Sequence, residues 1–197
     1  LLWISLIVIC LTVISSCGVV QKNEPANRPY VFKYNITVIV NFRKKKKNRL
    51  KSRLANQLDD SIKVRAARKI LYKGINRPVL VNPPLYESAN ADRSVIYMKA
   101  LLKSLGYFNA TITYKASIDT VASDELRTTV DFFVTPGKVV RIDSFAYNIK
   151  QPDLQALATK EPGLVKRGDP FAKSAISAEL DRLVLLYRNN GYMRFGR

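Results

Sequence analysis

The residue types that most often carry enzyme chemistry are nearly absent from this sequence. It contains no His, which is the commonest general base and a frequent metal ligand, and Cys occurs only at Cys10 and Cys17. The acidic pairs at 59–60 and 124–125 are adjacent, so their side chains point apart on a strand or helix. Capping at turns and helix ends accounts for such pairs without a catalytic role.

A phosphate-binding loop is the remaining candidate. Residues 163–168 (GLVKRG) have the outer spacing of such a loop, but Asp169 stands where the loop requires Lys. We find no paired carboxylates, metal cluster or activated nucleophile in the sequence. We therefore expect a protein that is not an enzyme and that has no cofactor.

The first residues form an uncharged, apolar segment that ends in a cysteine. Residues 1–14 are hydrophobic except for Ser5 and Thr12. The run is shorter than the roughly 20 apolar residues of a membrane-spanning helix, and it ends in small residues, as a signal-peptide core does. Residues 14–17 (ISSC) resemble a bacterial lipobox. That resemblance implies cleavage before Cys17 and lipid attachment to its thiol, and the alternative is an uncleaved anchor in which the cysteine is incidental.

The length and charge of the chain after Cys17 indicate what kind of partner it has. The chain has 197 residues and a formal net charge of +18, all of it after Cys17. Such a charge favours a polyanionic neighbour, either nucleic acid or an acidic membrane surface. Export argues against nucleic acid, whereas phospholipid headgroups fit a lipid-bearing protein. Because the sequence begins with Leu and lacks a positive signal region, we expect a fragment.

The charge is densest in residues 43–53 (RKKKKNRLKSR), of which 8 of 11 are basic and none is aromatic. Nucleic-acid binding usually adds stacking aromatics. Two interpretations stay open: a solvated helix face, or attraction to anionic headgroups, to which each charge near the surface contributes about 1 kcal/mol. The candidate contacts are Lys44, Lys45, Lys46, Lys47 and Arg49.

The elements that must carry these residues are predicted from periodicity. Residues 18–34 mix Pro, Asn and Lys with little periodicity and predict a tether. Residues 35–42 alternate as a strand does. A helix with a stripe at Leu50, Leu54 and Leu58 follows, and we expect it to start after Lys45 because lysines at a helix N-terminus oppose the dipole. Residues 62–75 fit either a continued helix or a second element.

The middle of the chain predicts a helix and two strands. The helix covers about 90–105, and Gly106 follows it where a left-handed C-terminal cap is needed. Residues 108–115 and 126–135 alternate between apolar and polar side chains. The first of these strands directs Thr111 and Thr113 outward.

The order then begins again. Residues 138–149 predict a strand, and a short helix is expected from Pro152. Asp169 and Pro170 would be the N-cap and first residue of a longer helix. That helix has an apolar stripe at Ile176, Leu180, Leu183 and Tyr187.

A repeated pair of residues indicates duplication. Gly106 and Tyr107 end one apolar helix, and Gly191 and Tyr192 end another, 85 residues later. A helix that must stop at once uses a residue that tolerates positive φ. Two such sites at domain-length spacing, each preceded by strand and helix, favour a duplicated module.

The order strand, helix, helix, strand, strand, with Gly-Tyr after the second helix and the joint at 136–137 (PG), resembles POTRA domains of the BamA and TamA outer-membrane assembly proteins. Together with the lipobox it looks most like the TamL lipoproteins. The resemblance implies an α+β fold of tandem β-α-α-β-β modules, after a signal segment at 1–17 and a tether at 18–34. The first module would cover 35–136, and the second, incomplete, 138–197. Pro136 replaces the Glu often found at the joint, and the insert between Asp59 and Asn90 exceeds a minimal module.

The resemblance also implies a function. Such proteins lie at the periplasmic side of the outer membrane and continue into a membrane β-barrel, which we expect beyond Arg197. Their modules bind nascent barrel strands or partner subunits by β-augmentation. The edge would be residues 108–115, with Phe108, Thr111 and Thr113 as candidate residues; alternatively, this strand is covered within its own domain. The implied partners are unfolded outer-membrane proteins, a TamB-like subunit, and membrane lipid through the acyl chain and barrel, with no nucleic acid.

Two other functions stay open. An inner-membrane protein with an uncleaved anchor and a POTRA module, as in the divisome protein FtsQ, would lack both acylation and a barrel. A basic nucleic-acid-binding protein would show binding whose logarithm falls linearly with the logarithm of salt concentration.

Overall fold

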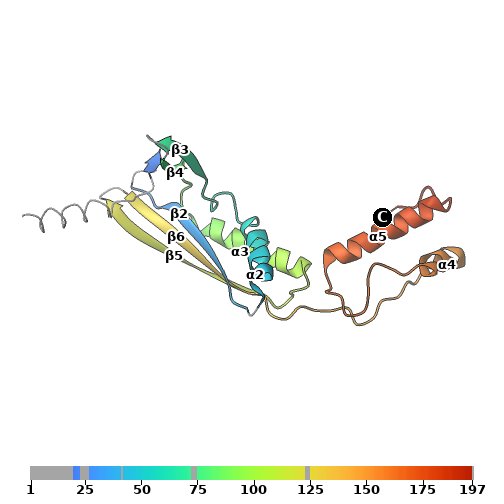
Figure 1. Cartoon of the computed structure of the whole chain (residues 1–197). Helices are drawn as coiled ribbons and strands as arrows, with labels where there is room; N and C mark the ends of the chain where they lie inside the picture. The colour runs from blue at the N-terminus through green and yellow to red at the C-terminus, as the bar shows by residue number, and fades with distance from the viewer. Residues whose placement is uncertain (1–19, 23–26, 41, 72–74, 123–124, 197) are drawn as a thin grey trace, which may run out of the picture. The chain divides into compact units, whose positions relative to one another are not determined.

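The computed structural model describes residues 20–22, 27–40, 42–71, 75–122 and 125–196. Figure 1 shows the order of the elements along the chain. The strands and helices in the described residues are β1 (Val20–Lys22), β2 (Tyr30–Val38), α2 (Lys44–Ala55), β3 (Ala66–Leu71), β4 (Ile75–Val81), α3 (Ser88–Ser104), β5 (Thr111–Ala122), β6 (Glu125–Thr135), α4 (Pro152–Lys160) and α5 (Lys173–Asn189).

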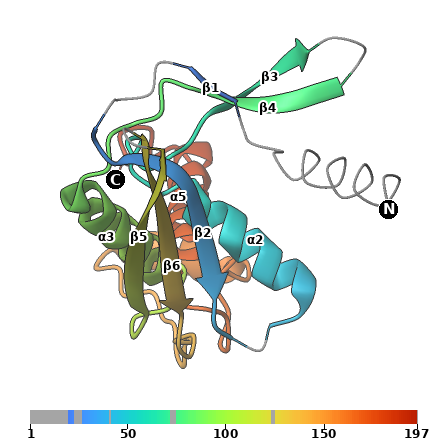
Figure 2. The ribbon, with the colours of Figure 1, turned by 90° about the vertical axis from the view of Figure 1, so that its left-hand side faces the viewer.

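The strands form two small sheets. In the first, β4 lies between β1 and β3, pairing parallel with β1 and antiparallel with β3. In the second, β6 lies between β2 and β5. Figure 2 shows β2 and β6 running in the same direction. β5 ends at Ala122 and β6 begins at Glu125, so the chain reverses between these two neighbouring strands and they are antiparallel. The second sheet is therefore mixed, and its two terminal strands are β2 and β5.

The second sheet and two helices have the predicted order of elements. The order is β2, α2, α3, β5 and β6, with the hairpin β3–β4 inserted between the helices. This confirms the α+β class. The described part of residues 62–75 is not a continued helix: a turn and irregular segment at 62–65 leads into β3, and residue 75 begins β4. The helix α2 begins at Lys44 in spite of its basic first turn.

The chain divides into two compact units. One comprises the described parts of residues 1–34, 60–90 and 116–130, and the other those of 35–59, 91–115 and 131–197. Within the second unit, α2 and α3 lie against one face of the sheet (Figure 2). Both helices and all three strands contribute buried side chains to this unit, including Ile36, Val38, Leu50, Leu54, Met98, Leu102, Ile112, Phe132 and Val134. The module boundaries inferred from the sequence stay a prediction.

The segment predicted to be a tether contains β1 and the first residues of β2. Tyr30 and Val31 are fully buried. Their backbone is held by a distant segment, because the Val31 N–H donates to Pro84 O at 2.8 Å and the Tyr86 N–H to Pro29 O at 2.8 Å. The local composition of residues 18–34 does not reveal such a partner.

The prediction of a strand over 138–149 is wrong, and so is the prediction that a strand starts after Gly191. In the first region the structure has a single isolated bridge between Arg141 and Pro170, and residues after Gly191 form turns. A strand needs a neighbour with which to exchange backbone hydrogen bonds. Within the described residues, Val140 and Ile142 bond to loop residues instead.

The two helices of this region form as predicted, with one difference at a cap. α4 begins at Pro152, but α5 begins at Lys173, with Ala172 at the N-cap position. Asp169 does not cap α5, because its carboxylate accepts from the Lys166 N–H at 3.0 Å within a turn. α4 and α5 share a cluster of buried residues made by Leu154, Ala158, Leu183 and Tyr187, while Leu180 of the predicted stripe is 45% exposed.

Candidate functional site

The predicted binding edge is the outer side of β5, a terminal strand of its sheet. Thr111 and Thr113 are exposed and Ile112 between them is buried, so the side chains alternate as predicted. β5 continues to Ala122, well beyond the predicted end, and carries Ile118 and Val121, which are 52% and 53% exposed. The strand therefore presents a longer edge than the sequence indicated.

Phe108 is not part of this edge. It precedes β5, and its ring lies 5.9 Å from that of Phe171, centroid to centroid. The residue is 42% exposed. Its packing on Phe171 gives it a role in holding two loops together.

The other terminal strand of the sheet is partly occupied. The start of β2 is bridged to Leu85 at Tyr30, next to the hydrogen bond between Val31 and Pro84. In the sheet that the structure describes, β5 has β6 as its one neighbouring strand. Of the two ends of the sheet, β5 is thus the better candidate for adding a further strand.

A helix cap joins the end of α3 to two later loops. Gly106 has φ +88°, as its predicted capping role requires, and the Tyr107 N–H donates to Leu102 O at 2.9 Å. The Gly106 carbonyl accepts from the Val140 N–H at 2.8 Å, and the Phe171 N–H donates to Val140 O at 2.9 Å. These bonds fix the loops at 139–141 and 170–172 beside the helix end.

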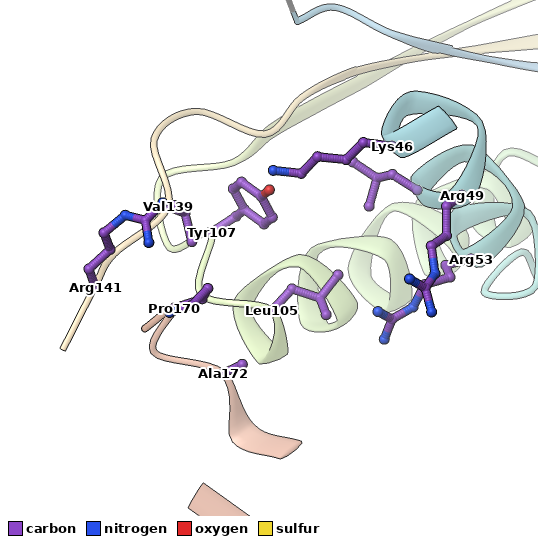
Figure 3. Close-up of a pocket in the computed structure, with 10 residues that line it drawn as sticks. Lys46, Arg49, Arg53, Leu105, Tyr107, Val139, Arg141, Pro170 and Ala172 are labelled. Atoms are coloured by element: carbon purple, nitrogen blue, oxygen red, sulfur yellow. The ribbon is translucent and has the colours of Figure 1, made fainter. Parts of the chain in front are cut away.

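These loops and α2 surround a cavity of about 430 Å³, which we call the basic cavity. Figure 3 shows Arg49 and Arg53 together on one side, Arg141 on the opposite side, and Lys46 reaching toward the Tyr107 ring. The apolar part of its wall consists of Leu50, Leu105, Tyr107, Val139, Pro170 and Ala172. We call this apolar part the floor of the cavity. The cavity therefore combines an apolar floor with four cationic side chains, and no acidic residue lines it.

Two of these cations are held in place. The Lys46 ammonium lies 4.2 Å from the centroid of the Phe42 ring. The Arg141 guanidinium donates to Gly168 O at 2.6 Å. The ion pairs that the described residues form involve Lys63, Arg93, Arg127, Arg167 and Arg182, so none of them neutralises a cation of the cavity.

The predicted basic contacts divide into two groups. All five lie in the first half of α2, but only Lys46 and Arg49 line the basic cavity. Sequence reasoning missed Arg53 and Arg141. Arg53 follows Arg49 by one helical turn, so its place on the same face was readable from the spacing. Arg141 is brought there by the loop, for which the sequence carries no local signal.

A buried polar cluster lies between α5 and two loops. The Glu179 carboxylate, 1% exposed, accepts from Tyr147 Oη at 2.5 Å, from Arg182 Nη2 at 2.7 Å and from the Leu164 N–H at 2.6 Å. Burial acts to raise the pKa of Glu179, but the hydrogen bonds from Arg182, Tyr147 and Leu164 outweigh it and hold this pKa below its ordinary value.

The role of this cluster is structural, because it joins α5 to two loops. Both carboxylate oxygens accept hydrogen bonds, so the ionised form is satisfied by the protein itself. A catalytic acid or base needs access to substrate, and a Glu that is this buried has none. No local pattern predicts this cluster, because Glu179 occupies an ordinary position between polar and apolar helix residues.

The remaining sequence candidates lie elsewhere. Asp59 pairs with Arg93 at 3.0 Å and Asp60 with Lys63 at 3.0 Å.

Cys17, the predicted site of lipid attachment, lies outside the described residues. Within the part of the chain that the structure describes, no group of three or more Asp, Glu or Cys side chains is placed to hold a metal ion. No described helix is long and apolar enough to span a bilayer.

Comparison with known proteins adds a distant likeness in fold. No protein-family model matches the chain, and no curated protein matches it. Among solved structures, the crystal structure of the BamA POTRA3-5 region from Haemophilus influenzae is similar over 87% of this chain and 90% of that chain, with a TM-score of 0.29 and 9% sequence identity. Since a likeness at this level carries no functional argument, the function has to be argued from the geometry of the chain.

Proposed function

We propose that this chain is a non-enzymatic, periplasmic part of an outer-membrane protein assembly or translocation factor. Its role is to hold extended polypeptides by β-augmentation at the outer side of β5. The observation that carries the proposal is the position of β5 as a terminal strand with exposed Thr111 and Thr113, while β2 at the other end is bridged to Leu85. A terminal strand offers backbone N–H and C=O groups to an added strand.

Two features of the sequence support a finer proposal. The lipobox at 14–17 and the order of elements favour a TamL-like lipoprotein anchored through Cys17 at the periplasmic side of the outer membrane. Unfolded barrel proteins are its clients, and a TamB-like subunit and a C-terminal barrel complete the machinery.

The test is site-specific photo-crosslinking. A photoreactive residue replaces Thr113 on β5, and a matched chain carries it at Lys99, which is exposed on α3. Each is mixed with a urea-denatured outer-membrane barrel polypeptide diluted into buffer. We expect crosslinks from the β5 position and few from α3, and equal yields at the two positions would contradict the proposal.

A second experiment separates backbone from side-chain recognition. A client peptide of alternating apolar and polar residues is compared with two peptides that are N-methylated at either the odd or the even residues. An added strand uses alternate N–H groups for the new ladder, so one of these peptides should lose binding and the other should keep most of it. Loss in neither would show that no ladder forms.

A further inference from the structure

The basic cavity is a second candidate binding site, separate from β5 and different in chemistry. It presents side chains rather than backbone. Arg49 and Arg53 approach the apolar floor from one side and Arg141 from the other (Figure 3). Because the ion pairs of the described residues leave these cations out, an anionic ligand would complete the charge balance of the site.

The floor adds a requirement for an apolar group. Tyr107 and Leu50 are buried beneath the cavity, 7% and 6% exposed. The volume of about 430 Å³ lies at the lower end of the range of ligand pockets. It has room for one or two large side chains. A ligand that fits both features has an apolar centre and negative charges on either side of it.

We propose that the basic cavity binds an acidic segment of a partner protein, in which carboxylates flank an aromatic or aliphatic side chain. A phospholipid fits less well, because its phosphate lies at one end of its apolar chains, whereas the cations here stand on opposite sides of the floor (Figure 3). Guanidinium groups pair with carboxylates through two parallel hydrogen bonds.

The site is partly organised before any ligand arrives. The Phe42 ring holds the Lys46 ammonium, and Gly168 O holds Arg141. The loop that carries Arg141 is fixed to Gly106 by the Val140 N–H. Side chains that are already placed lose less conformational entropy on binding.

The test measures binding of a fluorescein-labelled peptide, with two acidic residues on each side of a Phe-Leu pair, by fluorescence anisotropy to the full chain. In the double variant Arg49→Gln/Arg53→Gln we expect affinity to fall about tenfold. The matched variant Lys45→Gln/Lys51→Gln removes the same charge from exposed positions of α2 outside the cavity, and should lose less than about threefold. Arg141 is left unchanged because it also bonds to Gly168.

Two further arms decide between ligands. A control peptide with Asn and Gln in place of its acids should bind at least tenfold more weakly. Monomeric dihexanoyl phosphatidylglycerol, which offers the lipid's phosphate and apolar chains without a bilayer surface, should not displace the acidic peptide from the cavity. Equal losses in the two double variants, equal binding of the two peptides, or displacement by the monomeric lipid would each overturn the proposal.

A mapping experiment covers the case in which the arginine variant is misfolded. The acidic peptide carries a photoreactive Phe analogue at its centre and is crosslinked to the unmodified chain. We expect adducts at Tyr107 or Val139, which line the floor. Adducts confined to β5 would show that the peptide binds at the edge proposed for extended clients and would also overturn this inference.

Discussion

At the scale of single residues, Glu179 shows how one buried charge can organise a region that lacks strands. It ties α5 to Tyr147 and to the loop at Leu164 through hydrogen bonds to both of its oxygens. Arg182, also mostly buried, supplies the opposite charge. A buried pair of this kind contributes little relative to an apolar replacement, but the loss of one partner leaves an uncompensated charge.

Replacement of this carboxylate should therefore be costly. We expect Glu179→Gln to lower the free energy of unfolding by about 3 kcal/mol, because Arg182 keeps its charge without its partner. Urea denaturation followed by circular dichroism measures the change. The control is Glu161→Gln at an exposed position, for which we expect a change below about 0.5 kcal/mol. Similar values for both variants would mean that the cluster does not hold the region together.

The same carboxylate predicts a dependence on pH. The pKa of Glu179 is lowered in the folded chain from its ordinary value of 4.5. A lowered folded pKa means that its stabilisation is fully present above the unfolded pKa and is lost as pH falls through the folded value. Unfolding free energies measured between pH 7 and pH 3 should fall more steeply below pH 4.5 in the wild type than in Glu179→Gln. Parallel curves would argue against a lowered pKa.

At the scale of elements, the two Gly-Tyr caps have the same geometry and different surroundings. Gly106 and Gly191 have φ +88° and +93°. The backbone N–H of the tyrosine that follows each glycine donates to the carbonyl oxygen five positions earlier, from Tyr107 to Leu102 and from Tyr192 to Tyr187. A Cβ at Gly106 would lie 3.0 Å from Phe171 O, whereas nothing lies within 4 Å of one at Gly191. The two copies thus share the geometry of the helix cap. Of the two glycines, only Gly106 also packs closely against neighbouring loops.

Alanine at these two positions separates the roles. Gly191→Ala introduces only the strain of a left-handed backbone, about 1 kcal/mol. Gly106→Ala adds the displacement of the Phe171 and Val139 loops and should cost roughly 1–3 kcal/mol more. Urea denaturation of both variants under the same conditions provides the comparison. Equal losses of unfolding free energy in the two variants would show that the loops move aside at little cost. Such a result would also weaken the case for a preformed basic cavity.

At the scale of the whole molecule, sequence reasoning succeeded where the signal was local. The alternation in residues 126–135 correctly predicted β6, and Val130, Phe132 and Val134 are fully buried. It failed for 138–149, which has a similar pattern, because strand formation depends on a partner elsewhere in the chain. The site divides in the same way: Lys46 and Arg49 were predicted from a charge run, while Arg141 reaches the cavity through loop contacts that spacing does not encode.

The distribution of charge over the molecule supports a last prediction, on the lysines of α2 outside the cavity. Lys44, Lys45 and Lys47 do not line it and form no ion pair among the described residues. Each charge near an anionic bilayer contributes about 1 kcal/mol, or roughly fivefold in affinity. For a chain lacking residues 1–17, which removes the apolar start and Cys17, we expect vesicle binding that needs anionic lipid and weakens with salt.

Flotation with phosphatidylglycerol-containing and neutral vesicles measures this binding. Changing these three lysines to Gln should weaken it at least tenfold at low salt, since three contributions are lost. The control changes Lys99, Lys103 and Lys115, which are exposed on α3 and β5, and so removes the same net charge from other surfaces. If the run on α2 is a membrane-facing surface, the control keeps most of its binding. If both triple variants lose binding equally, net charge alone is responsible, and the run is an ordinary solvated helix face.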